Sequence, residues 1–522
     1  MTTITIGLDG ANWDMIEPWL SAGDLPNLQT LIDGGVGGVS ESCLPPLTVP
    51  NWKCYATGKN PGKLDVFRFD RIDTEAREHE FHDARSFKSA ELWDYLNQAG
   101  KRAGVVNKPS TYPPKDIDGF VVAGGPDASD SEYRSLSSQF ATPPDVEEYL
   151  REELDYRVHP SPMLSPSDTG PAEIEAVLDL IDLRFEAAER LLERESPEFL
   201  HLTVFYSMGL QHYFWRDEPV YRAWQRIDEN LARFVDEGHD LLVMSDHGTY
   251  EVEHTFYVNA WLEEQGYLVT EGNVDDWLRR LGVTRERALW LAKRLGAVEL
   301  LSTVVPEAIQ KRVPWSEGVK NDRILSLVDW AETTAIASNM GPVYLNADVA
   351  EADRLRAELA DELGGLEHPE TGETLVSAAH VGEELYAGPY ASNAPDLVLE
   401  AGPGVHISDA VGPDSWYEGP GVWIGGNMPE GIFLFNGPSF RDGDLDGEAN
   451  IVDLAPTLLH SMGVPVPEDV DGEVLDVFAP GSEPASRSVR TQPPLSRSGD
   501  RAQPASTNGE VERRLVDLGY ME

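Results

Sequence analysis

Short apolar runs alternate with helical patterns along the first half of the chain. The opening segment ITIGLDGAN (4–12) has the pattern of a buried strand that ends at Asp-Gly. Four further strands are predicted at 102–107, 119–124, 199–205 and 240–246. Helical patterns lie between the strands, most clearly at 171–194 and 220–237. This alternation predicts an α/β fold with a mostly parallel central sheet and helices on both faces.

Polar side chains stand at the carboxyl ends of two of these predicted strands. Asp9 ends the first strand, and Asp246 and His247 end the strand at 240–246. Ligands of open parallel sheets bind outside the carboxyl ends of the strands. The topology therefore predicts that the three side chains belong to one functional site.

The second half of the chain is less regular. Residues 268–327 form a charged helical stretch without a strand signal, which we interpret as an insertion and a candidate lid over the site. Strand patterns resume afterwards, at 333–339, 342–347, 395–401 and 431–437. The expected organisation is a catalytic domain made of 1–267 and 328–478, a disordered Ser-, Pro- and Arg-rich linker at 479–508, and a docking helix at 509–522.

The charge is extreme: Asp and Glu number 91 against 41 Lys and Arg, so the formal net charge is -50. Such a surface repels itself in dilute buffer and is screened at molar salt, where the Debye length is about 3 Å. We interpret the chain as a halophilic protein; an ordinary acidic protein is the alternative. The same charge argues against nucleic acid and anionic membranes as partners, because phosphate contacts need basic patches.

Other features of the chain bear on its location. No apolar run approaches the roughly 18 residues of a membrane-spanning helix, and the segment MTTITIGLDG has no secretory signal pattern. The two cysteines, Cys43 and Cys54, are too few for a disulfide framework. These observations predict a cytoplasmic protein and leave its oligomeric state open.

Three segments carry candidate chemistry. Thr48 is flanked by prolines beside a helical stretch, which places its hydroxyl near a helix N-terminus, where anions bind; a helix cap is the alternative. Asp246 and His247 join a carboxylate to an imidazole, and both are good ligands for zinc or a similar divalent ion. His212 lies in the aromatic run QHYFW, where a core histidine is the alternative to a ligand.

In order and spacing, these segments resemble the alkaline phosphatase superfamily, specifically a haloarchaeal-like member of its type I phosphodiesterase/nucleotide pyrophosphatase family. The resemblance is carried by IGLDGANWD, TVPNW with TGKNPGK, QHYFW, MSDHG, PVYLN, APDLVLE, PEGIFLFNGPSF and IVDLAPTLLHSMGVPVPEDVDG. It implies an alkaline-phosphatase-like fold. Sulfatases of the superfamily carry Cys or Ser where Thr48 stands, and threonine cannot become formylglycine, so sulfatase activity is not expected.

The resemblance also implies roles for individual residues. Thr48 matches the nucleophile and, together with Asp9, Asp246 and His247, the ligands of one metal ion. Bonding a hydroxyl oxygen to a divalent cation lowers its pKa so that an alkoxide can form. Asn51 matches an asparagine that helps hold the transferring phosphoryl oxygens.

The implied activity is metal-dependent hydrolysis of phosphate esters, of the phosphodiesterase or nucleotide pyrophosphatase type, through a phospho-Thr48 intermediate. Zinc is the expected cofactor, with manganese as the alternative, and one or two ions are expected. His212 matches a ligand of the second ion. The expected partner is a small phosphorylated substrate.

Two positions depart from the family pattern. The second metal of the family takes an Asp four residues before the position of His212 and a later His, where this chain has Met208 and Asn427. A thioether is a poor ligand for a hard divalent cation. Three explanations stay open: a one-metal enzyme, a catalytically reduced relative that binds a phosphorylated ligand or partner, or replacement of the lost ligands by His254, His406 or Asp217.

Overall fold

The structure is a computed structural model that describes residues 2–126, 128, 139–166, 168–235, 238–270, 322–346, 351–411, 415–445 and 448–497. Most of the expected insertion at 268–327 and the whole expected docking helix at 509–522 lie outside the described residues.

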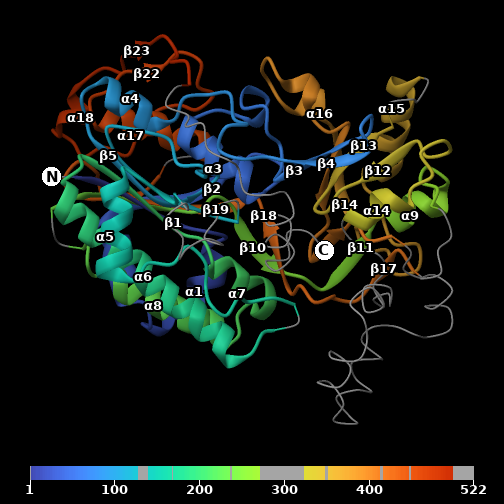
Figure 1. The fold of residues 1–522 in the computed structure, drawn as a ribbon, viewed down its shortest axis with the longest axis horizontal. Helices are drawn as coiled ribbons and strands as arrows, with labels where there is room; N and C mark the ends of the chain where they lie inside the picture. The colour runs from blue at the N-terminus through green and yellow to red at the C-terminus, as the bar shows by residue number, and fades with distance from the viewer. Residues whose placement is uncertain are drawn as a thin grey trace.

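A ten-stranded sheet forms the larger part of the molecule (Figure 1). Its order is β20-β2-β19-β9-β1-β8-β5-β6-β7, with β21 also paired to β2. The five central strands, β9, β1, β8, β5 and β6, run parallel to one another. On either side of them, β19 pairs antiparallel with β9 and β7 pairs antiparallel with β6. The strands are β1 (Thr3–Leu8), β2 (Gly35–Glu41), β5 (Ala103–Pro109), β6 (Gly119–Gly124), β7 (Ala141–Thr142), β8 (Phe199–Val204), β9 (Asp240–Met244), β19 (Glu430–Asn436), β20 (Gly443–Asp444) and β21 (Ala449–Asn450).

Helices cover both faces of this sheet, and with it they form what we call the sheet lobe. One face carries α1 (Trp13–Ala22), α5 (Pro144–Leu154), α6 (Pro171–Glu195), α7 (Ser207–Phe214) and α8 (Glu218–Leu231), with α2 (Pro26–Asp33) packed on α8. The other carries α3 (Thr48–Thr57), α4 (Leu92–Gln98) and α17 (Leu454–Ser461). All six residues of β1 are buried, as a strand covered on both faces requires. The predicted α/β fold with a mostly parallel sheet is confirmed.

A second lobe has its own hydrophobic core and its own sheets (Figure 1). Four strands pair antiparallel in the order β12-β13-β15-β14. Three more form a mixed sheet in the order β16-β11-β17, in which β11 runs parallel to β16 and antiparallel to β17. The elements are β11 (His254–Tyr257), α9 (Val258–Gln265), α14 (Asp322–Leu327), β12 (Ala335–Ala337), β13 (Pro342–Leu345), α15 (Ala352–Leu363), β14 (Val376–Val381), α16 (Gly382–Leu385), β15 (Leu397–Ala401), β16 (Val405–Ser408) and β17 (Tyr417–Glu418). Of the strands expected after residue 328, only β19 joins the large sheet. An apolar strand pattern does not tell which sheet the strand will enter.

Two short strands run between the lobes. β10 (Gly248–Glu251) starts directly after His247 and pairs antiparallel with β18 (Gly425–Met428). A small hairpin of β3 (Asp70–Asp73) and β4 (Glu78–Phe81) follows the turn η1 (Pro61–Lys63). The β10–β18 ribbon therefore places Asn427, which pairs with Thr249, beside the end of β9.

Residues 479–497 differ from the disordered linker that their composition predicts. They form α18 (Glu483–Ser486) and β23 (Thr491–Gln492), and β23 pairs with β22 (Val466–Pro467). Arg487 and Arg490 donate hydrogen bonds to the carbonyls of Ser461 and Gly463 at the end of α17. The arginines that suggested a solvated tail instead satisfy carbonyl groups that a helix end leaves unpaired.

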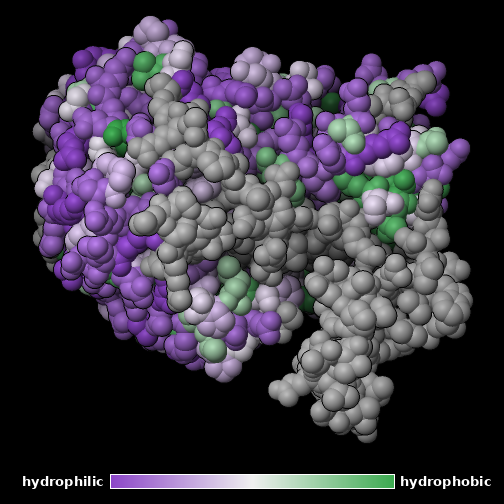
Figure 2. All heavy atoms as spheres, in the orientation of Figure 1, coloured by the Kyte–Doolittle hydropathy of each residue, from purple (hydrophilic) through white to green (hydrophobic). Residues whose placement is uncertain are grey.

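The surface agrees with the composition. Figure 2 shows one face on which hydrophilic residues predominate over the described part of the chain. Among the described residues, no helix is both long and apolar enough to cross a membrane.

Candidate active site

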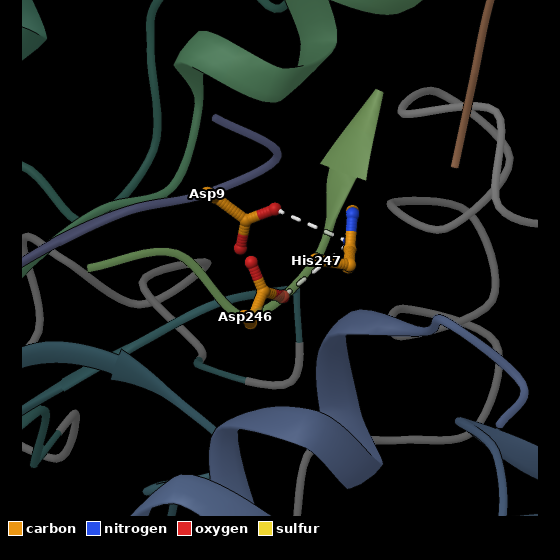
Figure 3. A group of neighbouring side chains, drawn as sticks. All are labelled: Asp9, Asp246 and His247. Carbon is orange, nitrogen blue, oxygen red and sulfur yellow. Dashed lines mark ion pairs between the residues drawn. The ribbon is translucent and has the colours of Figure 1, made fainter. Parts of the chain in front are cut away.

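Two carboxylate side chains and one imidazole converge at the carboxyl edge of the large sheet. Asp9 directly follows β1, and Asp246 and His247 follow the neighbouring strand β9. One ligand atom of each lies within 4.8 Å of the other two, and the three side chains point toward one another (Figure 3). All three are buried. The structure thus brings together the three residues that the strand ends predict; we call them the Asp-Asp-His cluster.

Each carboxylate in the cluster uses one oxygen and leaves the other available. Trp52 Nε1 donates to Asp9 Oδ2 at 2.8 Å, and the backbone N–H of Gly10 donates to Asp246 Oδ1 at 3.3 Å. Asp9 Oδ1 and Asp246 Oδ2 are buried and accept no hydrogen bond from the described residues. Buried acceptors of this kind call for a proton or a cation.

His247 directs the lone pair of one ring nitrogen toward the two available carboxylate oxygens. Its Nδ1 lies 2.9 Å from the carbonyl of Gly248, which only accepts, so Nδ1 carries the proton. Nε2 is then unprotonated, and it lies 3.8 Å from Asp9 Oδ1 and 3.4 Å from Asp246 Oδ2. A backbone carbonyl that holds the other ring nitrogen is the usual support of a metal-binding histidine. The donor set fits a divalent transition-metal ion.

Burial raises the pKa values of the two carboxyl groups, which metal binding would reverse, and lowers the pKa of His247, which metal binding would lower further. Desolvation raises the pKa of Asp9 to about 8, against a smaller lowering by the Trp52 hydrogen bond. Desolvation and the charge of Asp9 raise the pKa of Asp246 well above its usual range. Desolvation lowers the pKa of His247 to about 4, so its imidazole is neutral near pH 7. The cluster holds a proton on its carboxyl groups where a bound cation would displace it.

Thr48 meets the cluster from the other side. It is the first residue of α3, whose C-terminus is closed by Gly58 with a φ of 70°. Its Oγ1 lies 3.3 Å from His247 Nε2, and the residue is fully buried. The structure therefore places the predicted nucleophile against the predicted metal-binding nitrogen, at the N-terminal end of a helix that favours negative charge.

Trp52 is a site residue that the sequence reasoning missed. It lies one turn after Thr48 in α3, and its ring packs over β1, where a Cβ at Gly7 would lie 2.2 Å from Trp52 Cη2. Gly7 is therefore required for the approach that lets the indole reach Asp9. The signal was present in the sequence as a glycine one residue before the end of the first strand.

His212 lies near the cluster without belonging to it. Its Nδ1 donates to the carbonyl of Gly425 at 2.7 Å, and its ring stacks on Trp423 with centroids 3.8 Å apart. Desolvation, together with the neighbouring His247, lowers its pKa to about 3, against a raising by the hydrogen bond to Gly425. Met208 is buried with its sulfur against Gly10, because a Cβ on that glycine would lie 2.2 Å from Met208 Sδ.

Asn427 reaches the cluster from β18. Its Nδ2 donates to the carbonyl of Pro46 at 2.9 Å and lies 3.2 Å from His247 Nε2. The residue at this family position thus contacts a predicted ligand of the first metal, with an amide group where the family has an imidazole.

Asn51 occupies its hydrogen-bonding groups in a neighbouring loop. Its Nδ2 donates to the carbonyls of Cys43, Pro45 and Leu47, and its Oδ1 accepts from the backbone N–H of Cys43. In the structure Asn51 therefore braces the loop that leads into Thr48, and its contact with phosphoryl oxygens stays a prediction.

The three residues considered as replacement ligands differ in position. His406 lies beside His212, since both rings contact Trp423 and the charge of His406 lowers the pKa of His212. His254 pairs with Glu373 at 3.2 Å in the second lobe. Asp217 is exposed at the start of α8. Of these three, His406 is the one that the structure brings toward His212.

Comparisons with known proteins agree with this geometry. Residues 3–427 match the family model "Type I phosphodiesterase / nucleotide pyrophosphatase". Phosphonoacetate hydrolase from Sinorhizobium meliloti, solved in complex with phosphonoformate, is similar with a TM-score of 0.55 at 15% identity, over 89% of this chain and 95% of that one. Murine ectonucleotide pyrophosphatase/phosphodiesterase 5 has a TM-score of 0.51 at 13% identity, over 92% of this chain and 100% of that one. At these identities the structural likeness shows the fold.

Proposed function

Since the chain belongs to the type I phosphodiesterase/nucleotide pyrophosphatase family, we propose that it hydrolyses phosphate diesters at the Asp-Asp-His cluster, with Thr48 as the nucleophile and a divalent metal ion as cofactor. The observation that carries the proposal is the convergence of Thr48 Oγ1 on His247 Nε2, beside two buried carboxylate oxygens that accept no hydrogen bond from the described residues. Zinc is the proposed ion because the donor set combines an imidazole with carboxylates.

Asp9, Asp246, His247 and Thr48 would hold the ion. When bound, it would supply a positive charge that lowers the pKa of the threonine hydroxyl and neutralises charge on the phosphoryl oxygens. Trp52 holds the Asp9 carboxylate, and the Gly248 carbonyl holds the His247 ring in the tautomer with a free Nε2. Burial of the cluster excludes bulk water from the nucleophile.

The reaction would take place in two displacements. Thr48 Oγ1 forms a bond to phosphorus, and the bond from phosphorus to one alcohol breaks, so that this alcohol leaves with a proton. Water then attacks the phospho-Thr48 ester, its P–O bond to Thr48 breaks, and a phosphomonoester leaves while Thr48 regains its proton. The α3 N-terminus favours the negative charge that develops at phosphorus.

A small phosphorylated substrate fits this proposal. One structural neighbour is described in complex with phosphonoacetate, and an inactive variant of the murine neighbour in complex with AMP. The comparisons do not favour a catalytically silent relative, so that alternative enters as an outcome of the test.

Hydrolysis of bis-p-nitrophenyl phosphate, measured in molar KCl with zinc or manganese, tests the proposal. Metal-dependent turnover should fall about a thousandfold or more in Thr48→Ala, and Thr48→Ser should retain part of it because serine keeps a hydroxyl. Absence of turnover in a folded, metal-loaded protein, or equal turnover in Thr48→Ala, would contradict the assignment.

The departures at Met208 and Asn427 offer a second test. The double variant Met208→Asp, Asn427→His restores the family's ligand types at both positions. If the site hydrolyses diesters, this variant should raise metal stoichiometry, measured by elemental analysis, together with turnover. If turnover is absent before and after the replacement, the binding role replaces the hydrolytic one.

A further inference from the structure

A cleft with a volume of about 460 Å³ opens beside the Asp-Asp-His cluster. Pro46 and Asn427 line it from the sheet lobe and the β10–β18 ribbon, and Leu399, His406 and Ile407 line it from the second lobe. Its size is that of small-molecule sites, which often lie between lobes. Asn427 separates the cleft from the cluster, because it lines the cleft and its Nδ2 lies 3.2 Å from His247 Nε2.

The lining of the cleft is mostly apolar and lacks lysine and arginine in the part of the chain that the structure describes. No Lys or Arg is among the described residues that line it, whereas two glutamates, Glu400 and Glu430, are. Proteins bind phosphate and other anionic groups with arginine, lysine or exposed backbone N–H groups. The apolar side chains that line the cleft include Leu44, Met340, Leu399, Ile407 and Met428. These residues favour a hydrocarbon group and disfavour a second phosphate.

The rim of the cleft concentrates negative charge. Glu430 in β19 lies directly opposite Glu41 in β2, and like charges opposite each other destabilise a strand pair. Burial raises the pKa of Glu41, and the charges of Glu430, Glu448 and Glu400 raise it further. A cation bound near these carboxylates would relieve their mutual repulsion.

A buried acceptor belongs to one of the residues that line the cleft, directly beneath its surface. Asn427 lines the cleft with 7% of its surface exposed, and its Oδ1 accepts no hydrogen bond from the described residues. A buried amide oxygen without a donor is rare in native proteins. Since Nδ2 of the same amide is engaged with Pro46 and His247, Oδ1 is the atom that remains to accept an N–H from a ligand.

We infer that the cleft binds one ester group of the diester substrate, and that this group is an apolar alkyl chain bearing a protonated amine. The alkyl part contacts Leu399 and Ile407, the ammonium donates to Asn427 Oδ1, and Glu400 and Glu430 supply the negative potential. This inference rests on the proposed hydrolysis at Thr48. Diesters whose group in the cleft is anionic, such as a nucleotide with further phosphates, are poor substrates on this basis.

A series of three p-nitrophenyl phosphodiesters tests the inference, with an aminopropyl, a butyl or a carboxyethyl group as the second ester. The chains are of similar size and differ in charge, and release of p-nitrophenol reports each reaction. The aminopropyl ester should have a kcat/KM about tenfold above the butyl ester, and the carboxyethyl ester about tenfold below it. Glu430→Gln and Glu400→Gln should each lower the aminopropyl-to-butyl ratio about two- to fivefold.

Glu383→Gln is the matched control, because Glu383 is an exposed acid in α16 that does not line the cleft; it should leave the ratio unchanged. If all three esters react with the same kcat/KM, or if the carboxyethyl ester is preferred, the inference is overturned while hydrolysis at Thr48 stands. If none of the three esters is hydrolysed, or if Thr48→Ala hydrolyses them as fast as the wild type, the proposed function itself fails, and the inference with it.

Discussion

The hydrogen bond from Trp52 to Asp9 provides a direct test of how the cluster is held for a metal ion. Replacing Trp52 with Phe keeps an aromatic ring between Tyr55 and His201, whose rings pack edge-on against it. The change removes the Nε1–H that donates to Asp9 Oδ2 at 2.8 Å. Both residues are fully buried, so water does not replace the lost donor at this position.

The size of the effect follows from the type of bond. A hydrogen bond to a charged group contributes about 1.5–3 kcal/mol, and about 1.4 kcal/mol corresponds to a tenfold change in an equilibrium constant. If the bond is made to the metal-bound, ionised Asp9, its loss should weaken metal binding roughly 10- to 150-fold. Losses of 10- to 100-fold are typical for groups that support a metal ligand.

The assay is a competition between the protein and a chromophoric chelator for zinc at pH 8. Trp224→Phe is the matched control, since Trp224 is buried in α8 and its Nε1 has no hydrogen-bond partner among the described residues. That variant loses the same atoms from a buried indole and should bind zinc as the wild type does. A Trp52→Phe affinity within about twofold of this control would refute the reasoning that the hydrogen bond prepares Asp9 for the metal.

Three further predictions concern stability and pH. Gly7→Ala should lower the free energy of unfolding by about 1–3 kcal/mol, because the new Cβ would lie 2.2 Å from Trp52. Urea denaturation measures this loss. Gly419→Ala is the control, because a Cβ at Gly419 meets no atom within 4 Å. Asp228→Ala should lower the free energy of unfolding by about 1–3 kcal/mol in the same assay, because Asp228 caps α2 by accepting hydrogen bonds from two backbone N–H groups at its start. An unchanged free energy of unfolding would contradict this prediction. The pKa of Asp9 is raised in the folded, metal-free protein to about 8, so the stability that its proton contributes is fully present below pH ~4 and is lost as the pH rises through about 8. The gain in melting temperature on adding zinc should therefore widen between pH 6 and 8, and a gain that does not change with pH would contradict the prediction.

The large sheet and the core of the site could be predicted because both follow from a local pattern. Buried strands such as 199–205 are predominantly apolar, and their alternation with helices restricts them to one parallel sheet. Residues at the carboxyl ends of neighbouring strands must then meet. This rule predicts from the sequence alone that Asp9 lies close to Asp246 and His247.

The second lobe and the bracing of Asn51 could not be predicted in this way, because both depend on contacts between distant segments. β12 and β15 have the same apolar pattern as strands of the large sheet, yet pair in a separate antiparallel sheet. Asn51 is next to Trp52 in the sequence, but the two side chains serve different neighbours: one holds the Cys43–Leu47 loop and the other holds Asp9. Which neighbour each meets is decided by the rotation of α3 against the sheet.

Contacts between distant segments also explain why the residue at position 427 affects the site. Asn427 stands where the family has histidine, and it lies far from His247 in the sequence. The amide of Asn427 lies on His247 Nε2, the atom that Thr48 also contacts. A group that donates to a ligand's lone pair competes with a metal for it, whereas an imidazole at this position would offer a lone pair of its own. A cation at Nε2 would therefore replace the contact with Asn427, whereas Nδ2 would keep its hydrogen bond to the carbonyl of Pro46 at 2.9 Å and the amide would keep its orientation.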